Sequence, residues 1–514
     1  MTAKAPGKWL ITLSVMLPTM IEVLDTSVAN VALEHIQGSL SAGQDEVTWV
    51  LTSYLVANAV VIPMSGWLSR MMGRKRYLVA SVALFTLSSL LCGAATNLMQ
   101  IILFRVMQGI GGGGLQPVSQ AILLETFPAK QRGMAMAIFG LGVVMGPIFG
   151  PLVGGWITDT WSWRWIFYIN LPFGILAFYM CSAFVQDPPY LKRAKKGEEV
   201  DVLGLALLSV GIGCLQIVLD RGQQDDWFAS TNITVMSIIA VSALSFLVWW
   251  ELRHKNPVLD LRIFKSGSFS IGCVVMFLGF FAFFGSIVLL PMFLQGLMGY
   301  TALLAGLVLG PSGAVVFIFM PIAGKLTERI DARWILSFGL LLCSYSLYLM
   351  AGFNLNIDFF SAALPRAIQG AAMPFFFVAL SYLTFAYVKN NQMNNASALY
   401  NLLRNLGGSF GTAFVTTLLA RRAQYHQNIL TEHMTPLNPI YQLRLSEIQQ
   451  ALTAKLGPLS DHLEEARAFL YQELMKEANA LAFNDAFYIQ CLIFLCLVGG
   501  VWFMKKPPIK VDEE

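Results

Sequence analysis

Fourteen apolar segments, each long enough to cross a bilayer as a helix, follow one another along the chain. A spanning helix needs about 20 mostly apolar residues. The segments lie near 9–33, 47–69, 77–96, 98–124, 133–157, 163–186, 202–220, 231–251, 269–294, 301–324, 334–353, 359–387, 396–420 and 482–504. Only 12% of the residues are charged, about half the share found in soluble domains. We therefore expect an all-α polytopic membrane protein.

The distribution of lysine and arginine predicts the direction of these segments. One set of alternate connections carries most of the basic residues: Arg70, Arg74, Lys75, Arg76, Lys130, Arg132, Lys192, Arg193, Lys195, Lys196, Arg253, Lys255, Arg262, Lys265, Lys325, Arg329, Arg333 and Lys389. The other short connections hold only Arg164 and Arg221. Because basic loops stay in the cytoplasm and the number of spans is even, both termini are expected to be cytoplasmic.

A repeat links the beginning of the chain to its end. RVMQG at 105–109 returns as RAIQG at 366–370, 261 positions later. GWLSRMMGR at 66–74 has a weaker echo, 258 positions on, in GKLTERIDAR at 324–333. The shared offset indicates duplication of a six-helix unit. The expected organisation is an N-terminal bundle at 1–187, linkers with two inserted helices at 188–267, and a C-terminal bundle at 268–514.

Two carboxyl groups stand inside the first apolar segment. Glu22 and Asp25 are three residues apart, so on a helix they point to the same side. A charge at the bilayer centre costs about 2.5–3.5 kcal/mol on insertion scales, so such residues usually face a polar interior and have a function. Measured along their helices, Asp25 and Arg105 fall at similar depths in the outer half of the membrane. We expect Arg105 to pair with one of the two carboxyls, Asp25 or Glu22, and the carboxyls to form the proton site of a transporter.

A static ion pair that only holds helices together is the alternative interpretation. If the pair were structural, the second unit should repeat the acid, yet the position 260 after Asp25 is Gly285, and 269–294 contains no acid. This asymmetry favours coupling residues in the first unit alone, opposite a mainly apolar second wall rich in phenylalanine. The candidates for a substrate cavity are Asn30, Phe280, Phe284, Phe376 and Asn405.

The segment 133–157 is rich in small residues. Glycines recur every four positions and clear one helix face, while two prolines favour a bend. These residues are Gly142, Gly146, Pro147, Gly150, Pro151, Gly154 and Gly155. The pattern predicts a close packing seam, and its functional interpretation is a seam between the two bundles. In 396–420, Arg404 is a further buried charge, with either a functional role or a role in capping helix carbonyls.

Catalytic and metal-binding signatures are absent from the sequence. The five histidines fall in predicted loops, and the seven cysteines lie in apolar segments without a CxxC pair. No HExxH or P-loop motif occurs, and no basic stripe stands apart from the membrane loops. An enzyme, a metal site and a nucleic-acid partner are therefore not expected. The connection at 421–481 is expected outside the membrane, either docking a partner or simply solvated.

Several motifs together resemble one family. They are LDTSVANVAL at 24–33, GWLSRMMGRKR at 66–76, RVMQG at 105–109, GPIFGPLVGG at 146–155, WRWIFYINLPFG at 163–174 and NLLRNLGGSFGTA at 401–413. They are similar to signatures of the major facilitator superfamily, in particular its fourteen-helix drug:proton antiporters of the EmrB/QacA type. The similarity covers essentially the whole chain, and LQIVLDRGQQDDWF and NPVLDLRIFKSGSFSIGC most resemble the EmrB members.

The resemblance implies alternating access in the inner membrane, with protons moving inward as hydrophobic or amphipathic drugs move out. Asp25 and Arg105 match positions linked to proton coupling, and Gln108, Gly109 and Arg74 lie in conformational motifs. The energy source implied is the proton gradient, without a cofactor. The partners implied are membrane lipid, a periplasmic adaptor of the EmrA type and an outer-membrane channel of the TolC type.

Two positions depart from the pattern that the resemblance implies. The wider superfamily has an aspartate where this chain has Arg70, so Glu328 is expected to supply the carboxylate of the cytoplasmic charge network. Glu22 replaces a neutral residue and is interpreted as a second proton or cation-recognition site. The alternative function is a dedicated proton-coupled exporter of one endogenous molecule, such as a siderophore, lipid or metabolite. A membrane-embedded enzyme or sensor is disfavoured.

Overall fold

The computed structural model describes residues 7–188, 201–456 and 462–506, which are largely helical. The first half comprises α1 (Lys8–Val31), α2 (Leu33–Leu40), α3 (Gln44–Val47), α4 (Trp49–Met72), α5 (Arg74–Ala94), α6 (Leu98–Gly112), α7 (Leu115–Thr126), α8 (Arg132–Thr160), α9 (Trp165–Tyr168) and α10 (Asn170–Phe184). Two further helices follow, α11 (Val202–Arg221) and α12 (Thr231–Arg253). The second half comprises α13 (Gly267–Met292), α14 (Ala302–Leu326), α15 (Ala332–Met350), α16 (Phe359–Phe385), α17 (Met393–Thr431), α18 (Pro439–Leu456) and α19 (Leu463–Val501).

Twelve helical stretches among the described residues are long and apolar enough to span a membrane. α8 and α17 run through the same bundle, where α8 packs on α1 and α14, and α17 packs on α13 and α4. Polar side chains such as Asn401 and Arg404 make α17 less apolar than its neighbours. The fold is thus the predicted all-α polytopic bundle, and these two helices with the twelve stretches agree with the expected fourteen spans.

The two halves repeat the same helix pairings. In the first half α1 packs on α8 and α10, and α6 packs on α4 and α5. In the second half α13 packs on α17 and α19, and α16 packs on α14 and α15. A Cβ on Gly109 would lie 2.6 Å from the Tyr54 carbonyl of α4, and one on Gly370 would lie 2.5 Å from the Ser312 carbonyl of α14. The repeat in the sequence therefore corresponds to a repeat in the packing.

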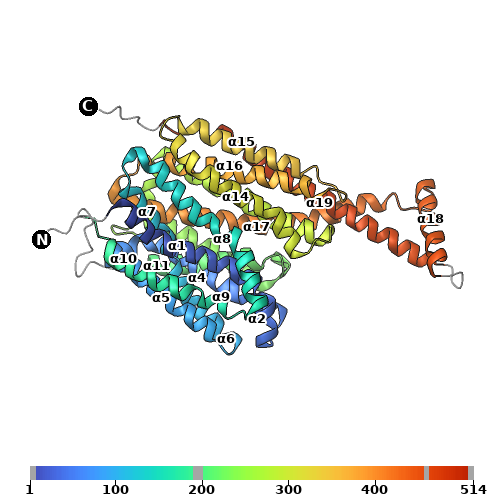
Figure 1. Ribbon diagram of the computed structural model, residues 1–514, viewed down its shortest axis with the longest axis horizontal. Helices are drawn as coiled ribbons and strands as arrows, with labels where there is room; N and C mark the ends of the chain where they lie inside the picture. The colour runs from blue at the N-terminus through green and yellow to red at the C-terminus, as the bar shows by residue number, and fades with distance from the viewer. Residues whose placement is uncertain (1–6, 189–200, 457–461, 507–514) are drawn as a thin grey trace.

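The halves meet along two reciprocal helix pairs, α8 with α14 and α4 with α17. The described ends of the chain lie together at one end of the bundle, which we call the terminal end (Figure 1). The opposite end carries the projecting helices α17, α18 and α19, and we call it the hairpin end (Figure 1). α11 packs beside this junction, against α4 and α17, and α12 packs on α11.

The glycine face of α8 packs against α1 inside the first half. A Cβ on Gly146 would lie 2.5 Å from the Val23 carbonyl, and one on Gly150 would overlap Ser27. The other glycines of this face, Gly142, Gly154 and Gly155, lie against Met16, Val28 and Val31. The interpretation of this face as the seam between the bundles is therefore wrong, because its spacing clears space for α1 instead.

Two other glycines of α8 form the contact between the halves. Gly133 packs against Thr327, the residue that follows α14, and Gly140 packs against Met320 and Phe377. Both glycines lie off the helix face on which glycine recurs every four residues. The spacing of glycines in the sequence therefore did not show that they form the contact between the halves. The side chain of Pro147 lies outside the described positions.

The fourth predicted span, 98–124, is two helices rather than one. α6 ends at Gly112 and α7 begins at Leu115. Between them a Cβ on Gly113 would lie 2.8 Å from the Asn58 carbonyl, and one on Gly114 would overlap the Tyr77 ring. Only glycine allows this close approach to α4 and α5. The break sets the start of α7 against α1, which matters for the site.

The distal hairpin comprises the ends of α17 and α19 beyond the bundle together with α18. α17 and α19 have 39 residues each, about 58 Å at 1.5 Å per residue, which exceeds the roughly 30 Å of bilayer hydrocarbon. Leu445 and Ile448 of α18 pack with Ala466 and Leu470 of α19 in a small core of their own. The hairpin therefore projects as an ordered element from the bundle (Figure 1).

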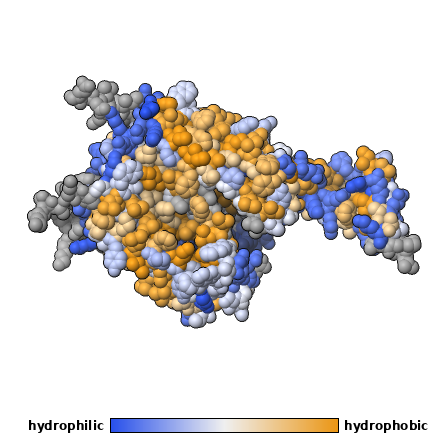
Figure 2. All heavy atoms as spheres, in the orientation of Figure 1, coloured by the Kyte–Doolittle hydropathy of each residue, from blue (hydrophilic) through white to orange (hydrophobic). Residues whose placement is uncertain are grey.

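Apolar side chains cover the side of the bundle. Leu152, Trp156 and Phe360 are 64%, 62% and 79% exposed. Figure 2 shows hydrophobic residues over the middle of the visible face and hydrophilic residues at the terminal end and along the hairpin. Such a belt is the surface expected of helices that face lipid. The chain is a multi-pass membrane protein.

Candidate functional site

Asp25 of α1 lies at the centre of a buried polar network. Its Oδ2 accepts a hydrogen bond from Arg105 Nη1 of α6 at 2.6 Å, so of the two carboxyls expected as partners of Arg105 it is Asp25 that forms the ion pair. Its Oδ1 accepts from Gln108 Nε2 at 2.9 Å and from Asn170 Nδ2 of α10 at 2.6 Å. Asp25 and Arg105 are 2% and 1% exposed. The carboxylate is therefore paired and hydrogen-bonded entirely within the first half.

Arg105 is held as firmly as its partner. Its Nη1 also donates to Gln108 Oε1 at 2.7 Å, and its Nε donates to the Val50 carbonyl at 3.0 Å. Its guanidinium lies 4.2 Å from the centroid of the Tyr54 ring, close enough for a cation–π contact. Gln108 Nε2 donates in addition to Ser89 Oγ at 2.7 Å. A network with these groups satisfied is rigid and specifies one arrangement.

Glu22 lies almost one turn before Asp25 and has a different set of partners. Its Oε1 accepts from Tyr54 Oη and Asn58 Nδ2, each at 3.2 Å, and its Oε2 accepts from Gln116 Nε2 at 2.5 Å. Each donor is a neutral group, and no salt bridge among the described residues includes Glu22. The side chain is nonetheless buried, at 3% exposure. The two carboxyls thus have different hydrogen-bond donors, and Tyr54 touches both networks, with its hydroxyl on Glu22 and its ring against Arg105.

Gln116 carries the second network into the other half of the molecule. Its Oε1 accepts a hydrogen bond from Arg404 Nη2 of α17 while its Nε2 donates to Glu22. Arg404 is 4% exposed, its guanidinium lies 5.8 Å from the Phe280 ring, and its Nη1 has no hydrogen-bond partner among the described residues. Its observed role is thus a bond to Gln116, rather than the predicted alternative of capping helix carbonyls.

Of the residues predicted for a substrate cavity, the three phenylalanines lie together. Phe280, Phe284 and Phe376 form one aromatic cluster, in which the Phe280 centroid lies 5.7 Å from Phe284 and 6.3 Å from Phe376. Asn405 is partly exposed on α17, whereas Asn30 is exposed near the end of α1. The cluster adjoins Arg404 through Phe280, and Asn30 does not belong to it. Their roles in substrate binding stay predictions.

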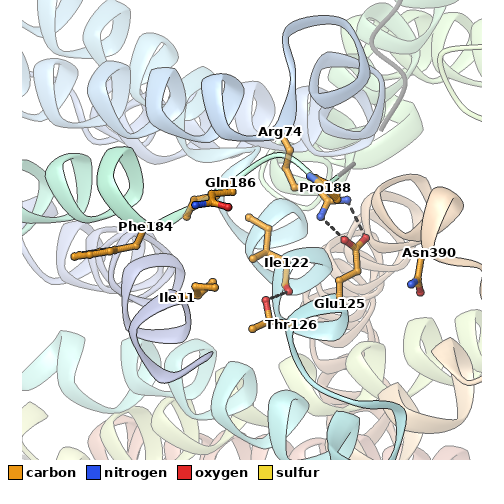
Figure 3. A pocket seen from close by; sticks show the side chains of 10 residues that line it. Ile11, Arg74, Ile122, Glu125, Thr126, Phe184, Gln186, Pro188 and Asn390 are labelled. Carbon is orange, nitrogen blue, oxygen red and sulfur yellow. Dashed lines mark hydrogen bonds and ion pairs between the residues drawn. The ribbon is translucent and has the colours of Figure 1, made fainter. Parts of the chain in front are cut away.

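A pocket at the terminal end surrounds an ion pair that the sequence analysis missed (Figure 3). Arg74 Nη1 and Nη2 donate to the two carboxylate oxygens of Glu125 at 2.6 and 2.9 Å. Asn390 of the second half lines the same pocket. Glu328, which was expected to supply this carboxylate, is exposed. The bidentate geometry assigns that role to Glu125 within the first half.

Other residues of the site also escaped the sequence analysis. They are polar side chains inside apolar spans: Tyr54, Asn58, Ser89, Gln116 and Asn170. A search for amides within the spans would have found three of them, because an unpaired amide in hydrocarbon is costly. The sequence gives no sign of which carboxyl each amide contacts, since that depends on how the helices are rotated.

Relatives with similar sequences share nearly the full length of the chain. The sequence model of the Major Facilitator Superfamily matches residues 15–412. The chain is 38% identical to the multidrug export protein EmrB of Escherichia coli, covering 97% of this chain and 95% of that protein. It is 39% identical to EmrB of Haemophilus influenzae, covering 97% and 96%. The fatty acid resistance protein FarB of Neisseria gonorrhoeae is 36% identical, with the same coverage.

Solved structures share the fold at low sequence identity. The human organic anion transporter MFSD10 matches with a TM-score of 0.60 and 14% identity, covering 96% of this chain and all of that one. The proton:xylose symporter XylE matches with a TM-score of 0.59 and 15% identity, covering 96% and 95%. The relatives are transporters rather than enzymes and indicate multidrug efflux. By its sequence match, its relatives and its fold, the chain belongs to the major facilitator superfamily, among the fourteen-helix transporters of the EmrB/QacA type.

Proposed function

We propose that this protein is a proton-coupled antiporter that exports hydrophobic and amphipathic compounds by alternating access. The observation that supports this most directly is the position of Glu22, a buried carboxyl joined through Gln116 to Arg404 where the halves meet. A group that gains or loses a proton there changes the attraction between the halves. Proton movement and the rearrangement of the halves are thereby linked.

The two carboxyls have different roles in this proposal. Asp25 is engaged by the Arg105 cation and two amide donors, so exchanging its proton requires that ion pair to open. Glu22 accepts hydrogen bonds from neutral donors only. A proton arriving at Glu22 weakens the bond from Gln116 and loosens its contact with Arg404. Glu22 is therefore the carboxyl that exchanges in this conformation, and Asp25 is the charge that fixes Arg105.

The conformation fits one end of an alternating-access cycle. Besides the bond from Arg404 to Gln116, hydrogen bonds between the halves among the described residues lie toward the terminal end, where Gln120 Oε1 accepts from Ser397 and Asn401, and Arg132 donates to the Phe385 carbonyl. Toward the hairpin end the ribbons of α8 and α14 separate (Figure 1). With the basic terminal end in the cytoplasm, this is a state closed to the cytoplasm.

The proposed substrates are hydrophobic or amphipathic. Relatives are named for multidrug export, fatty acid resistance and colistin resistance. In this chain, the aromatic cluster of Phe280, Phe284 and Phe376 provides apolar surface beside the buried charge of Arg404. A wall of this kind recognises shape and apolar area rather than one pattern of hydrogen bonds, which suits a broad range of compounds.

The proposed partners act at the distal hairpin. Leu437, Ile440 and Leu443 are 93%, 77% and 63% exposed there, in the part of the chain outside the bundle. Exposed apolar side chains outside the membrane are typical of interaction sites. We assign this surface to a periplasmic adaptor of the EmrA type, leading to an outer-membrane channel of the TolC type. The protein itself lies in the inner membrane, with both termini in the cytoplasm.

The decisive experiment reconstitutes the protein in liposomes that contain a pH-sensitive dye and measures proton release when a lipophilic drug is added. Wild type is expected to release protons in proportion to drug. Glu22→Gln is expected to abolish this release while the protein stays folded. Asp159→Asn is the matched control, since it removes an exposed carboxyl of α8 whose side chain is 75% accessible. Normal drug-dependent release by Glu22→Gln would exclude Glu22 as the exchanging group.

A dedicated exporter of one endogenous lipid-like molecule is the second candidate function. The relative named for fatty acid resistance favours it. A resistance profile in a host that lacks its own efflux pumps separates the two candidates. Protection against many unrelated compounds supports multidrug export, whereas protection against one class alone supports the dedicated exporter.

A further inference from the structure

The second half contains a copy of the Asp25 network without its carboxylate. Arg366 Nη1 donates to Gln369 Oε1 at 2.5 Å, as the equivalent pair does at 2.7 Å in the first half. Gln369 Nε2 then donates to Ser286 Oγ of α13 at 2.9 Å, where its counterpart donates to Asp25 at the same distance. By its hydrogen bond to the repeated glutamine, Ser286 takes the place of Asp25.

Arg366 is a buried cation without a carboxylate partner among the described residues. It is 8% exposed, and its Nε forms no hydrogen bond there. The ion pairs formed by the described residues do not include it. Its guanidinium lies 5.9 Å from the Phe283 ring, a weaker contact than Arg105 makes with Tyr54 at 4.2 Å. Its charge is thus left uncompensated by the protein.

A second unpartnered group lies on the neighbouring helix. Gln490 of α19 is fully buried, and neither its Nε2 nor its Oε1 forms a hydrogen bond with the described residues. Its Nε2 would lie 2.8 Å from a Cβ on Gly285, the residue before Ser286. Because α19 packs on α13 as α10 packs on α1, Gln490 corresponds to Asn170, the amide that donates to Asp25. The donors of the network therefore have counterparts here, and the carboxylate is missing.

A buried guanidinium in a membrane protein requires a counter-charge or dense hydrogen bonding. We propose that the second half binds a small inorganic anion such as chloride between α13, α16 and α19, where Arg366 and the Gln490 amide provide the N–H donors. The anion occupies the position that the Asp25 carboxylate occupies in the first half. Both halves then carry one cation and one anion at the same place in the repeat.

The location limits the kind of anion and its route. Arg366 lies about 10 Å along α16 from its first residue, Phe359, at 1.5 Å per residue. The start of α16 is at the hairpin end, so the anion exchanges with that side. Because the donors are almost completely buried, a small monovalent ion fits between them better than a bulky organic acid. This site does not depend on the proposed proton coupling.

The test measures thermal unfolding of the full chain in detergent as chloride replaces methanesulfonate at constant ionic strength. The unfolding midpoint of wild type is expected to rise with chloride and then saturate, because a ligand that binds only the folded state stabilises it. Arg366→Gln and Gln490→Leu are expected to lose this rise. Arg333→Gln, at the terminal end, is the control and keeps it. Radiolabelled chloride is expected to bind wild type at a single saturable site.

A charge placed at Ser286 gives an independent test. Ser286→Asp supplies the missing carboxylate, so its midpoint in chloride-free buffer is expected to reach that of wild type in saturating chloride, with no further response. Ser286→Asn has the same size without the charge and is expected to show no such increase. An identical chloride response in wild type, Arg366→Gln and Gln490→Leu overturns the proposal. Stabilisation by octanoate but not by chloride also overturns it, because the ligand would then be an organic carboxylate.

Discussion

The two halves share one helix arrangement and differ in how they treat a buried arginine. In the first half, Arg105 is neutralised by Asp25 and held by a saturated network. In the second half, Arg366 keeps its glutamine, but that glutamine donates to Ser286, which has no charge. The positions that shape the backbone are alike in the two halves, whereas the position that carries the negative charge differs.

The glycine seams show how closely the packing has been kept. Gly146 of α8 lies against the Val23 carbonyl of α1. Gly407 of α17, 261 positions later, lies against the Phe277 carbonyl of α13. Each glycine lets two helix backbones approach closely, which a side chain would prevent. The halves therefore share their backbone packing but differ in their buried charges, which allows them to have different functions.

Asp25→Asn is expected to have the largest effect. Asparagine keeps the shape of the side chain but removes the charge opposite Arg105, so the first half comes to resemble the second. Active efflux is expected to fall to background while the protein still folds. The measurement is drug export from energised vesicles, with size-exclusion chromatography as the check on folding. Full efflux in this variant would remove Asp25 from the mechanism.

Loss of the arginines is expected to affect stability unequally. Arg105→Gln leaves Asp25 buried and unpaired, which typically costs about 3–5 kcal/mol. Arg366→Gln in chloride-free buffer removes a cation that has no carboxylate partner, so its cost is expected to be under about 1 kcal/mol. Thermal unfolding of the two purified variants gives the comparison. An equal loss of stability in the two variants would contradict the inferred difference in how Arg105 and Arg366 are neutralised.

Alanine at the seam glycines is expected to have similar effects in the two halves. Gly146→Ala and Gly407→Ala each force a methyl group onto a backbone carbonyl, and such overpacking typically costs about 1–3 kcal/mol. Gly306→Ala is the matched control, since nothing lies within 4 Å of its Cβ position. That change is expected to be neutral or to stabilise the helix slightly. A seam variant as stable as the control would mean that the helices separate at no cost.

The helix caps are expected to give the smallest effect and to differ in pH dependence. Asn97 accepts from Gln100 N at the start of α6, and Asp358, 261 positions later, accepts from Phe360 N at the start of α16. Asn97→Ala is expected to cost about 1 kcal/mol at any pH. The hydrogen bond from the Ser361 hydroxyl holds the pKa of Asp358 below its usual value.

A lowered pKa means that the folded state binds the proton of Asp358 less tightly than the unfolded state does. The contribution of this cap is therefore present at neutral pH and is lost as the pH falls through the lowered value. Unfolding midpoints of Asp358→Asn and wild type, compared between neutral and acidic buffer, measure it. The difference is expected to narrow in acid. A difference that does not change with pH would contradict the assigned cap.

Much of the fold was predictable because it follows from local composition. Long apolar segments, basic loops and the returning RxxQG pattern are each readable in a single stretch of sequence. An ion pair between Arg105 and a carboxyl of the first span was predictable for a related reason, because opposite charges at similar depth in hydrocarbon attract each other strongly. The break between α6 and α7 was missed because it falls in the four glycines at 111–114. Glycines have no side chains, so the hydrophobic pattern does not show where one helix ends and the next begins.

The sequence by itself determined that this chain spans a membrane, that it contains a repeated pattern and that its first span carries charge. Only the tertiary structure decided which carboxyl faces which partner. Glu22 and Asp25 are neighbours on one helix, but their side chains point in slightly different directions. Asp25 therefore pairs with Arg105, whereas Glu22 accepts a hydrogen bond from Gln116. The reason is geometric: hydrogen bonds act over about 3 Å, and helix rotation and crossing set which side chains come within that distance.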